Sequence, residues 1–339
     1  MHTPWSPTQA HNWYARRPWP VGFNYVPSCA VNSIECWQAE SFDFATIERE
    51  LAWGGRLGFN TVRVFLPYLV WQFEAHSFKA RIHQFLSAAS ANGLSAMFCL
   101  FDDCAFNRKD PWLGKQDEPV PGKMATGWTA SPGQTLVNDR AAWPALERYV
   151  RDIVGEFAQD PRVFLWDLYN EPGNEGQGEK SLSLVRHVFD WARAVSPSQP
   201  LTSGVWNFAP ENRTLNEALL DASDVVTFHS YAPLDGVEAI VAKLQARNRP
   251  ILCTEYMARL CDSRFATHLP YFKSHQIGAL HWGLVNGRMQ TQFPWPALQA
   301  LHPDAKEWFH DLLHPDGQPY ATEEIEIIRA CTGATRSYP

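Results

Sequence analysis

Two glutamates that end apolar runs are the residues of this sequence best suited to chemistry. The run 166–170 leads into Glu171 and Pro172, and a proline cannot continue a strand ladder. The run 250–254 leads into Glu255 in a similar way. Hydrolysis of a glycosidic bond needs such a pair, namely a protonated acid for the leaving oxygen and a carboxylate that attacks or activates water. We therefore take Glu171 and Glu255 as the candidate catalytic residues.

The segments that would position these glutamates alternate between short apolar runs and longer amphipathic stretches, which is typical of repeated β-α units. The expected strands are 21–25, 61–66, 96–101, 163–169, 201–204, 225–229, 251–256 and 279–284. The expected helices are 44–57, 78–92, 141–158, 180–194, 215–221, 236–246, 263–275 and 323–331. Asp43 and Gly58 flank the first helix as capping residues. This pattern predicts an α/β fold, a (β/α)8 TIM barrel.

We expect one catalytic domain over residues 1–339, with 1–20 as an N-terminal extension and 102–139 as a long loop after the third strand. In a TIM barrel the active site lies at the C-terminal ends of the strands, so glutamates ending the fourth and seventh strands would face one mouth. The long loop would rise from the same face. It either walls off one side of the pocket or packs on itself as a surface excursion.

Composition argues against several classes of partner. The 29 Lys and Arg residues and 36 Asp and Glu residues give a net charge of −7 without a basic run, so neither nucleic acid nor an anionic membrane is expected to bind. The 15 Trp residues exceed what a core normally uses, so several should line a cleft. The seven Cys residues show no CxxC or zinc-type spacing, and the sequence contains no Gly-rich phosphate-binding fingerprint, so neither a metal nor a cofactor is expected.

No apolar signal segment opens the chain and no long apolar stretch follows, so the expected location is cytoplasmic. A leader removed earlier would instead allow a periplasmic or secreted location.

The motifs resemble clan A of the glycoside hydrolases, and within it the family 5 cellulase-like enzymes, over nearly the whole barrel from Gly22 to Trp282. The resemblance implies that Glu171 is the acid/base and Glu255 the nucleophile of a retaining double displacement. It also implies substrate-site roles for residues of the second, fourth, sixth and eighth strands, namely Arg63, Asn170, His229, Tyr231 and Trp282.

Elementary electrostatics gives the two carboxyl groups different expected pKa values. Arg63 and Tyr231 would hold Glu255 ionised through hydrogen bonds and lower its pKa. Glu171, facing that anion in a partly dry pocket, would have a raised pKa and keep its proton.

Asn170 would bind the sugar 2-hydroxyl, and Trp282 would present an apolar face to the ring. Taken singly, some of these residues have structural alternatives. Arg63 could satisfy a buried carboxylate, His229 could hold a neighbouring loop, and Trp282 could simply pack in the core.

The chain departs from the family pattern after the third strand, where many members place a His that contacts the sugar. We expect Asp102 or Asp103 to replace that contact. In the first loop, Glu35 and Trp37 would lie beside the glycone, although Glu35 could equally pair with a nearby Arg. Further polar and aromatic lining is expected from Trp206, Asn207, Asn286 and Arg288.

The long first and third loops and the extension 285–295 favour a closed glycone end. We therefore expect an exo-acting enzyme, or one acting on short oligosaccharides or glycoconjugate glycans, with β-mannoside or β-glucoside favoured. A β-xylosidase or an endo-β-1,4-glycanase of the same clan is the alternative, because one barrel hosts many specificities. A non-catalytic carbohydrate-binding barrel is the alternative from another class. A metal-dependent barrel hydrolase would typically need a His-x-His at the end of the first strand, where this chain has Gly22, Phe23 and Asn24.

Overall fold

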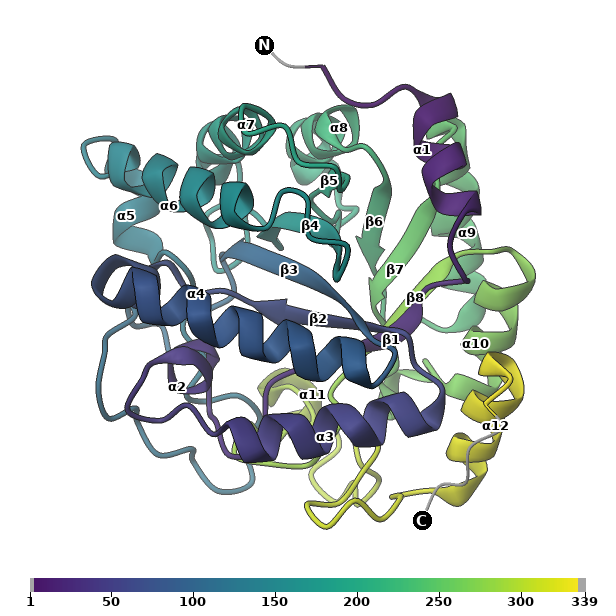
Figure 1. The fold of residues 1–339 in the computed structure, drawn as a ribbon. Coiled ribbons are helices and arrows are strands. Elements are labelled where there is room, and N and C mark those ends of the chain that lie inside the picture. Colours follow the sequence, from purple (N-terminus) through teal and green to yellow (C-terminus); the bar gives the residue numbers. More distant parts are fainter. Residues whose placement is uncertain (1–2, 335–339) are drawn as a thin grey trace.

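The strands of this chain close into a barrel. In a computed structural model that describes residues 3–334, the strands form one eight-stranded parallel sheet in the order β5-β4-β3-β2-β1-β8-β7-β6. They are β1 (Val21–Asn24), β2 (Thr61–Phe65), β3 (Ser95–Asp102), β4 (Val163–Asn170), β5 (Leu201–Thr202), β6 (Val226–His229), β7 (Ile251–Glu255) and β8 (Gly278–Trp282). Figure 1 shows them in the middle of the molecule, with helices packed around the outside.

The two ends of this sheet, β5 and β6, meet through a short parallel bridge. Val205 pairs with Phe228, its N–H donates to the Thr227 carbonyl at 3.0 Å, and the His229 N–H donates to the Val205 carbonyl at 2.9 Å. The ring of hydrogen bonds therefore closes, and the predicted (β/α)8 barrel is confirmed.

Each of the eight expected helices has a counterpart. These are α3 (Phe44–Leu57), α4 (Tyr68–Ala91), α6 (Trp143–Glu156), α7 (Lys180–Arg193), α8 (Arg213–Ala222), α9 (Leu234–Leu244), α10 (Phe265–Ser274) and α12 (Thr322–Thr332). The expected caps of α3 are confirmed, because Asp43 accepts from the Thr46 N–H and Gly58 ends the helix at a φ of 95°. Helix α4 begins earlier than expected, across a kink at Glu74.

Several short elements of the structure were not expected from the sequence. These are the helices α1 (Pro7–Ala15), α2 (Ser33–Trp37), α5 (Gln134–Asn138) and α11 (Pro296–Leu301), and the 3-10 turns η1 (Pro210–Asn212), η2 (Gln245–Arg247) and η3 (Arg259–Cys261). Helices α2, α5 and α11 lie within the loops that follow β1, β3 and β8. They fold these long connections into compact walls.

Along the barrel axis the interior changes from apolar to polar. Met97, Leu165, Val225, Leu252 and Leu280 form one buried apolar cluster at the N-terminal ends of the strands. Side chains two residues apart on a strand point to the same face. The next inward-facing residues beyond Met97 and Leu165 are therefore Cys99 and Asp167, which belong to a polar layer above the apolar cluster. This arrangement places the polar groups at the C-terminal mouth.

Helix α1 covers the N-terminal end of the barrel. Its buried residues Ala10 and Trp13 join the apolar cluster of Met97 and Leu165, and the Trp13 ring lies 5.1 Å from that of Phe164. The expected extension 1–20 is therefore partly a plug for the barrel floor.

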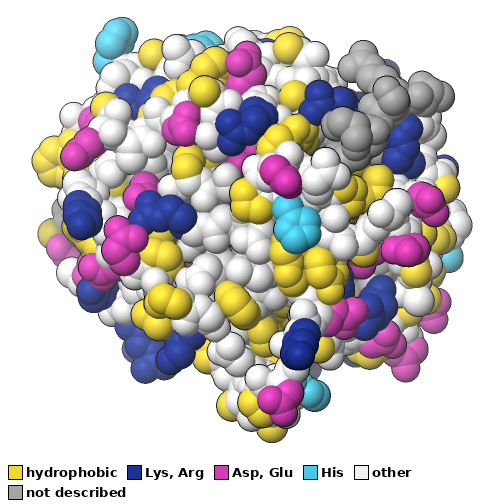
Figure 2. All heavy atoms as spheres, turned by 90° about the horizontal axis from the view of Figure 1, so that it is seen from below, with side chains coloured by type: hydrophobic (Ala, Val, Ile, Leu, Met, Phe, Trp, Pro, Cys, Tyr) yellow, Lys and Arg dark blue, Asp and Glu magenta, His cyan; other side chains and the backbone are white. Residues whose placement is uncertain are grey.

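On the face seen in Figure 2, positive and negative side chains are interspersed among hydrophobic ones. No helix in residues 3–334 has the length and apolar character needed to cross a bilayer.

We predict that Trp13→Ala lowers the free energy of unfolding by about 3–5 kcal/mol, because it removes a large buried ring and leaves a cavity. Urea denaturation followed by circular dichroism measures the change. The matched control is Phe73→Ala on α4, whose side chain is 66% exposed and whose removal should cost no more than about 0.5 kcal/mol. Equal stability of the two variants would contradict the plug.

Candidate active site

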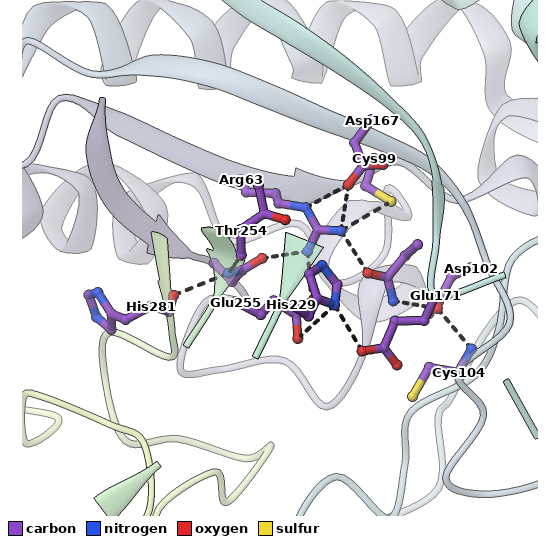
Figure 3. Close-up of polar contacts among 12 residues, drawn as sticks. Arg63, Cys99, Asp102, Cys104, Asp167, Glu171, His229, Thr254, Glu255 and His281 are labelled. Atoms are coloured by element: carbon purple, nitrogen blue, oxygen red, sulfur yellow. Dashed lines mark hydrogen bonds and ion pairs between the residues drawn. The ribbon is translucent and has the colours of Figure 1, made fainter. Parts of the chain in front are cut away.

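Arg63 lies fully buried at the centre of the polar layer (Figure 3). Its Nη1 donates to Glu255 Oε1 at 2.9 Å and to Asn24 Oδ1 at 2.6 Å. Its Nε and Nη2 donate to Asp167 Oδ2 at 2.9 and 2.6 Å, and Nη2 also donates to Asn170 Oδ1 at 2.6 Å. One cation on β2 therefore fixes side chains of β1, β4 and β7. The structural alternative for Arg63 holds, and its predicted contact with Glu255 is present, whereas its part in catalysis stays a prediction.

Glu255 ends β7 with both oxygens engaged. Oε1 accepts from Arg63, and Oε2 accepts from the Tyr231 hydroxyl at 2.8 Å. Burial is the largest influence and raises the pKa of Glu255, as does nearby Glu171, whereas His229, Arg63 and Tyr231 act in the opposite direction. The predicted fall in this pKa is therefore wrong. The physical reason is that Glu255 is desolvated and shares the Arg63 guanidinium with Asp167.

Glu171 follows β4 in a left-handed backbone conformation, with a φ of 43°. This conformation costs a non-glycine residue about 1–3 kcal/mol, and residues that adopt it cluster at functional sites. Asn174 Nδ2 donates to Oε2 at 2.7 Å, and His229 Nδ1 lies 2.9 Å from Oε1. Burial raises the pKa of Glu171 to about 7. The predicted rise is confirmed.

His229 lies between the two glutamates (Figure 3), with its Nδ1 3.7 Å from Glu255 Oε2. Burial lowers the pKa of His229 to about 4, so the imidazole is neutral near pH 7. A neutral ring can accept a hydrogen bond from protonated Glu171 or, as the other tautomer, donate one to its carboxylate. His229 is therefore a direct neighbour of the acid group rather than only a loop support.

A cavity of about 330 Å³ opens beside these carboxyl groups, which is within the usual range for ligand pockets, about 300–1,000 Å³. Of the predicted site residues, the cavity is lined by Asn170, Glu171, Trp206, His229, Tyr231, Glu255 and Trp282. Seven positions spread over β4 to β8 and their loops thus meet at one mouth. Arg63 lies beneath it and acts through Glu255 and Asn170.

Asp102 does not reach the cavity, and the prediction that it or Asp103 contacts the sugar is wrong. Asp102 is 1% exposed, and its oxygens accept from Asn170 Nδ2, Trp128 Nε1 and the Cys104 N–H, each at 2.8 Å. Asp103 is equally occupied, by Tyr169 and two other donors, Ser181 and the Gly173 N–H. These two carboxyl groups lie beneath the cavity and hold neighbouring side chains, such as Asn170, in place.

The first loop also departs from expectation. Trp37 is fully buried against Phe78 and Phe85, and its Nε1 donates to the Phe65 carbonyl at 2.7 Å. It belongs to the core, so its predicted place beside the glycone is wrong. For Glu35 the pairing alternative holds, because Oε1 accepts from Arg288 Nη1 at 2.5 Å.

Neither Asn207 nor Asn286 lines the cavity. Asn207 Oδ1 instead accepts from the Ala209 N–H at 3.0 Å. Arg288 does not line the cavity either. It donates instead to Glu35 and Glu118 in the loops after β1 and β3.

Several lining residues were not singled out from the sequence. From the loop after β3 these are Cys104, Phe106, Met124, Ala125 and Trp128; the others are Phe65, Asn174, Glu175, Ser230, Met289 and Trp295. The length of the loop after β3 was the sequence feature that could have indicated these residues. Of the two alternatives for this loop, the one in which it walls off one side of the pocket holds. Asn174 gave a weaker signal, since it stands only three residues beyond Glu171.

Glu171, His229 and Glu255 form the one group among the described residues whose ligand atoms could hold a metal ion, all within 4.8 Å of one another. The guanidinium of Arg63, 2.9 Å from Glu255 Oε1, opposes a cation there. That no metal or cofactor takes part stays a prediction.

A family model for the cellulases of glycosyl hydrolase family 5 matches residues 35–287. The chain belongs to glycosyl hydrolase family 5. This confirms the resemblance noted in the sequence, and the family is one of glycoside hydrolases. Among curated proteins, none matches the chain.

Solved structures share the barrel with this family 5 chain at low sequence identity. An exo-β-1,4-mannosidase from Opitutaceae bacterium strain TAV5 has a TM-score of 0.62 and 20% identity, over 94% of this chain and 60% of that one. A subfamily 18 protein of family 5 from Streptomyces cattleya, in complex with Manb1-4GlcNAc, has a TM-score of 0.61 and 14% identity, over 94% and 82%. The β-mannanase of the blue mussel Mytilus edulis has a TM-score of 0.55 and 15% identity, over 85% and 93%. These likenesses establish the fold.

We predict that Asn174→Ala raises the pKa of Glu171 above its value of about 7, because the amide N–H stabilises the charged carboxylate. Carbon-13 NMR of the carboxyl groups measures this pKa, with Glu171→Gln used to assign the signal. Asn216→Ala, which removes a donor to the Asn207 carbonyl, is the control and should leave the pKa unchanged. A lower pKa in Asn174→Ala would contradict the assigned hydrogen bond.

The raised pKa of Glu171 also makes the free energy of unfolding depend on pH. Between the ordinary pKa of 4.5 and about 7, the folded protein keeps a proton that the unfolded chain has lost. The contribution of Glu171 to the free energy of unfolding is therefore full below pH 4.5 and is lost as the pH rises through about 7.

Proposed function

We propose that this family 5 chain is a retaining β-mannoside hydrolase that removes sugars from chain ends. The observation that carries the retaining mechanism is the closeness of the two carboxyl groups, whose ligand oxygens lie within 4.8 Å of each other. Retaining enzymes hold their carboxyl groups about 5–5.5 Å apart, whereas inverting enzymes need about 6.5–9.5 Å to admit a water molecule. This closeness favours the retaining arrangement over the inverting one.

In the first step Glu255 attacks the anomeric carbon and forms a covalent ester. The bond from that carbon to the leaving oxygen breaks, and Glu171 transfers its proton to this oxygen. In the second step Glu171 takes a proton from water, the water oxygen bonds to the anomeric carbon, and Glu255 leaves as a carboxylate. The pKa of Glu171, about 7, suits a group that first donates and then accepts a proton.

Three neighbours support these steps. Arg63 and Tyr231 donate to the two oxygens of Glu255, which stabilises it as attacking and as leaving group. The side-chain Oδ1 of Asn170 accepts from Arg63, and one N–H of its side-chain amide donates to Asp102. The second amide N–H of Asn170 remains for the 2-hydroxyl of the sugar.

The exo mode rests on what we call the loop clasp, the set of contacts made by residues 288–290 with the loops after β1 and β3. Arg288 Nη1 and Nη2 donate to Glu35 at 2.5 Å and to Glu118 at 3.0 Å. Gln290 Nε2 donates to the Val120 carbonyl at 2.9 Å. Figure 1 shows the loop after β3 running towards α11 on this side of the molecule.

Backbone groups complete the loop clasp. The Ala125 N–H donates to the Met289 carbonyl at 2.8 Å, and the Gly122 N–H donates to Gln290 Oε1 at 2.9 Å. Three loops that are distant in sequence thus close one end of the pocket. A closed end favours a pocket for a terminal sugar over a groove for a polymer.

The choice of mannoside is supported by the relatives with this fold. One is described as an exo-β-1,4-mannosidase, one as a complex with Manb1-4GlcNAc and one as a β-mannanase. The proposed substrates are therefore β-mannosides at the ends of oligosaccharides or glycoconjugate glycans. A β-glucoside stands second, and endo action is the alternative that the loop clasp disfavours.

Glu255→Ala should reduce hydrolysis of an aryl β-mannoside to background, since no covalent intermediate can form. Glu171→Ala should lose about 10²–10⁴-fold on β-mannobiose but much less on a dinitrophenyl mannoside, whose leaving group needs little protonation. Steady-state kinetics measures both losses, and NMR should show the β-anomer as first product. The control Phe73→Ala should keep full activity. Undiminished turnover in Glu255→Ala, or an α-anomer as first product, would overturn the mechanism.

The wild-type protein should release single mannose units from β-1,4-mannopentaose, with mannotetraose as the other early product. Arg288→Ala, which removes the ion pairs to Glu35 and Glu118, should loosen the loop clasp and allow internal cleavage to mannobiose and mannotriose. Chromatography of early digests measures the product lengths. Arg186→Ala, at an exposed position on α7, serves as the matched control. Random product lengths from the wild type would contradict exo action.

A further inference from the structure

The two halves of the pocket lining differ in polarity. The half under the loop clasp, here called the closed half, is lined from β2, β8 and the loops after β3 and β8. Its residues are Phe65, Cys104, Phe106, Met124, Ala125, Trp128, Trp282, Met289 and Trp295. The open half is lined from β4 to β7, and carries the carboxyl, amide, imidazole and hydroxyl groups of the site. A sugar in this pocket therefore meets different chemistry on its two sides.

Aromatic edges and thioethers make the closed half a packed wall. The Phe65 ring lies 5.1 Å from Trp128 and 6.0 Å from Trp282, both at steep angles, and these two indoles lie 6.3 Å apart. Met124 and Met289 belong to the same buried cluster. Because the side chains interlock, the wall does not need a ligand to order it.

Polar groups near this wall are engaged elsewhere in the protein. Trp128 Nε1 donates to Asp102, both of whose carboxylate oxygens are engaged, and the Ala125 N–H donates to the Met289 carbonyl. Of the side-chain groups in the closed half, the Cys104 thiol and the other indoles are donors, and the thioethers are only weak acceptors. A free hydroxyl needs an acceptor for its proton, so several hydroxyls buried here would lose hydrogen bonds made in water.

The chemistry at the glutamates decides which part of the sugar meets this wall, and this step rests on the proposed function. The leaving oxygen must lie at Glu171, so the aglycone departs through the open half, past the partly exposed Asn174, Glu175 and Trp206. The anomeric carbon is held at Glu255. The opposite edge of the ring, with C3, C4 and C6, then lies in the closed half.

We propose that the closed half is a binding site for methyl or acyl groups on the glycone, and that the preferred substrate is a β-mannoside O-alkylated or O-acylated at C4 or C6. Such a group has no proton to donate. It presents apolar surface to Phe106, Met124 and Met289, and its oxygen can accept from the indole or thiol donors. The Asp102 carboxylate, placed where it could have read a hydroxyl, is instead turned to Asn170 and Trp128.

The test compares 4-nitrophenyl β-D-mannoside with its 4-O-methyl, 6-O-methyl and 6-deoxy analogues, which serve as stable probes. The wild type should hydrolyse one of the O-methyl compounds with kcat/KM about tenfold or more above the parent, the scale of a methyl group in a fitted apolar pocket. If the 6-O-methyl compound is the one preferred, the 6-deoxy compound should fall between it and the parent, since it removes the 6-hydroxyl without adding the methyl group. Glu255→Ala should abolish hydrolysis of every compound.

Variants of the wall test its composition. Met289→Gln and Met124→Gln offer an amide of similar length, so each should lower the ratio of O-methyl to parent kcat/KM about tenfold, with Met289→Leu keeping the ratio. Circular dichroism and the midpoint of thermal unfolding show that a variant is folded. Cys104→Ser is the second route if Met289→Gln does not fold. It introduces a hydroxyl into the same wall and should shift the ratio in the same direction.

A wild type that hydrolyses the parent faster than both O-methyl compounds overturns this inference and leaves the proposed function standing. Failure of the wild type to hydrolyse any of the mannosides overturns the proposed function as well. Unchanged ratios in folded Met289→Gln and Met124→Gln proteins would place the methyl group elsewhere and overturn the assignment to the closed half.

Discussion

The buried guanidinium of Arg63 is the interaction on which the rest of the site depends. A fully desolvated cation is costly unless its donors are all paired, and here they reach Asp167, Glu255, Asn170 and Asn24. These partners come from three other strands, so the charge can be satisfied only when the barrel is closed in register. Removing either carboxylate would leave guanidinium N–H donors of Arg63 without acceptors in a dry interior. The catalytic geometry and the assembly of the barrel are therefore one constraint.

Desolvation also shifts the pKa values of the neighbouring groups Glu171 and His229 in opposite directions. Burial raises the pKa of Glu171 to about 7 and lowers that of His229 to about 4, so the carboxyl group rather than the imidazole carries the proton that can be exchanged near neutral pH. Glu255 is desolvated too, but it alone faces both Arg63 and Tyr231. Hydrogen-bond partners therefore divide the roles of the two glutamates, although burial acts on both in the same direction.

The barrel separates stability from chemistry along its axis, and the loops divide the chemistry again across the mouth. Helix α1 and the apolar layer around Met97 close the floor, where no substrate approaches. Above the polar layer, the loop clasp brings sulfur and aromatic side chains to one half of the pocket, and the strands β4 to β7 bring polar ones to the other. Fold and carboxyl pair are common to many enzymes, so we propose that substrate choice rests on this asymmetry of the loops.

The sequence by itself determined the barrel, the two strand-end glutamates and the capping of α3 at Asp43 and Gly58, because strand and helix periods, proline stops and cap residues are local signals. Only the tertiary structure decided what each polar or aromatic side chain meets. Trp37 entered the core, Asp102 turned to Asn170, and Glu35 found Arg288, which is 253 residues away along the chain. Helix α1 gave no sign of its place beneath the barrel. The physical reason is that a sequence pattern fixes which face of an element is apolar, whereas the partner that satisfies a buried polar group is supplied by segments brought together only when the barrel closes.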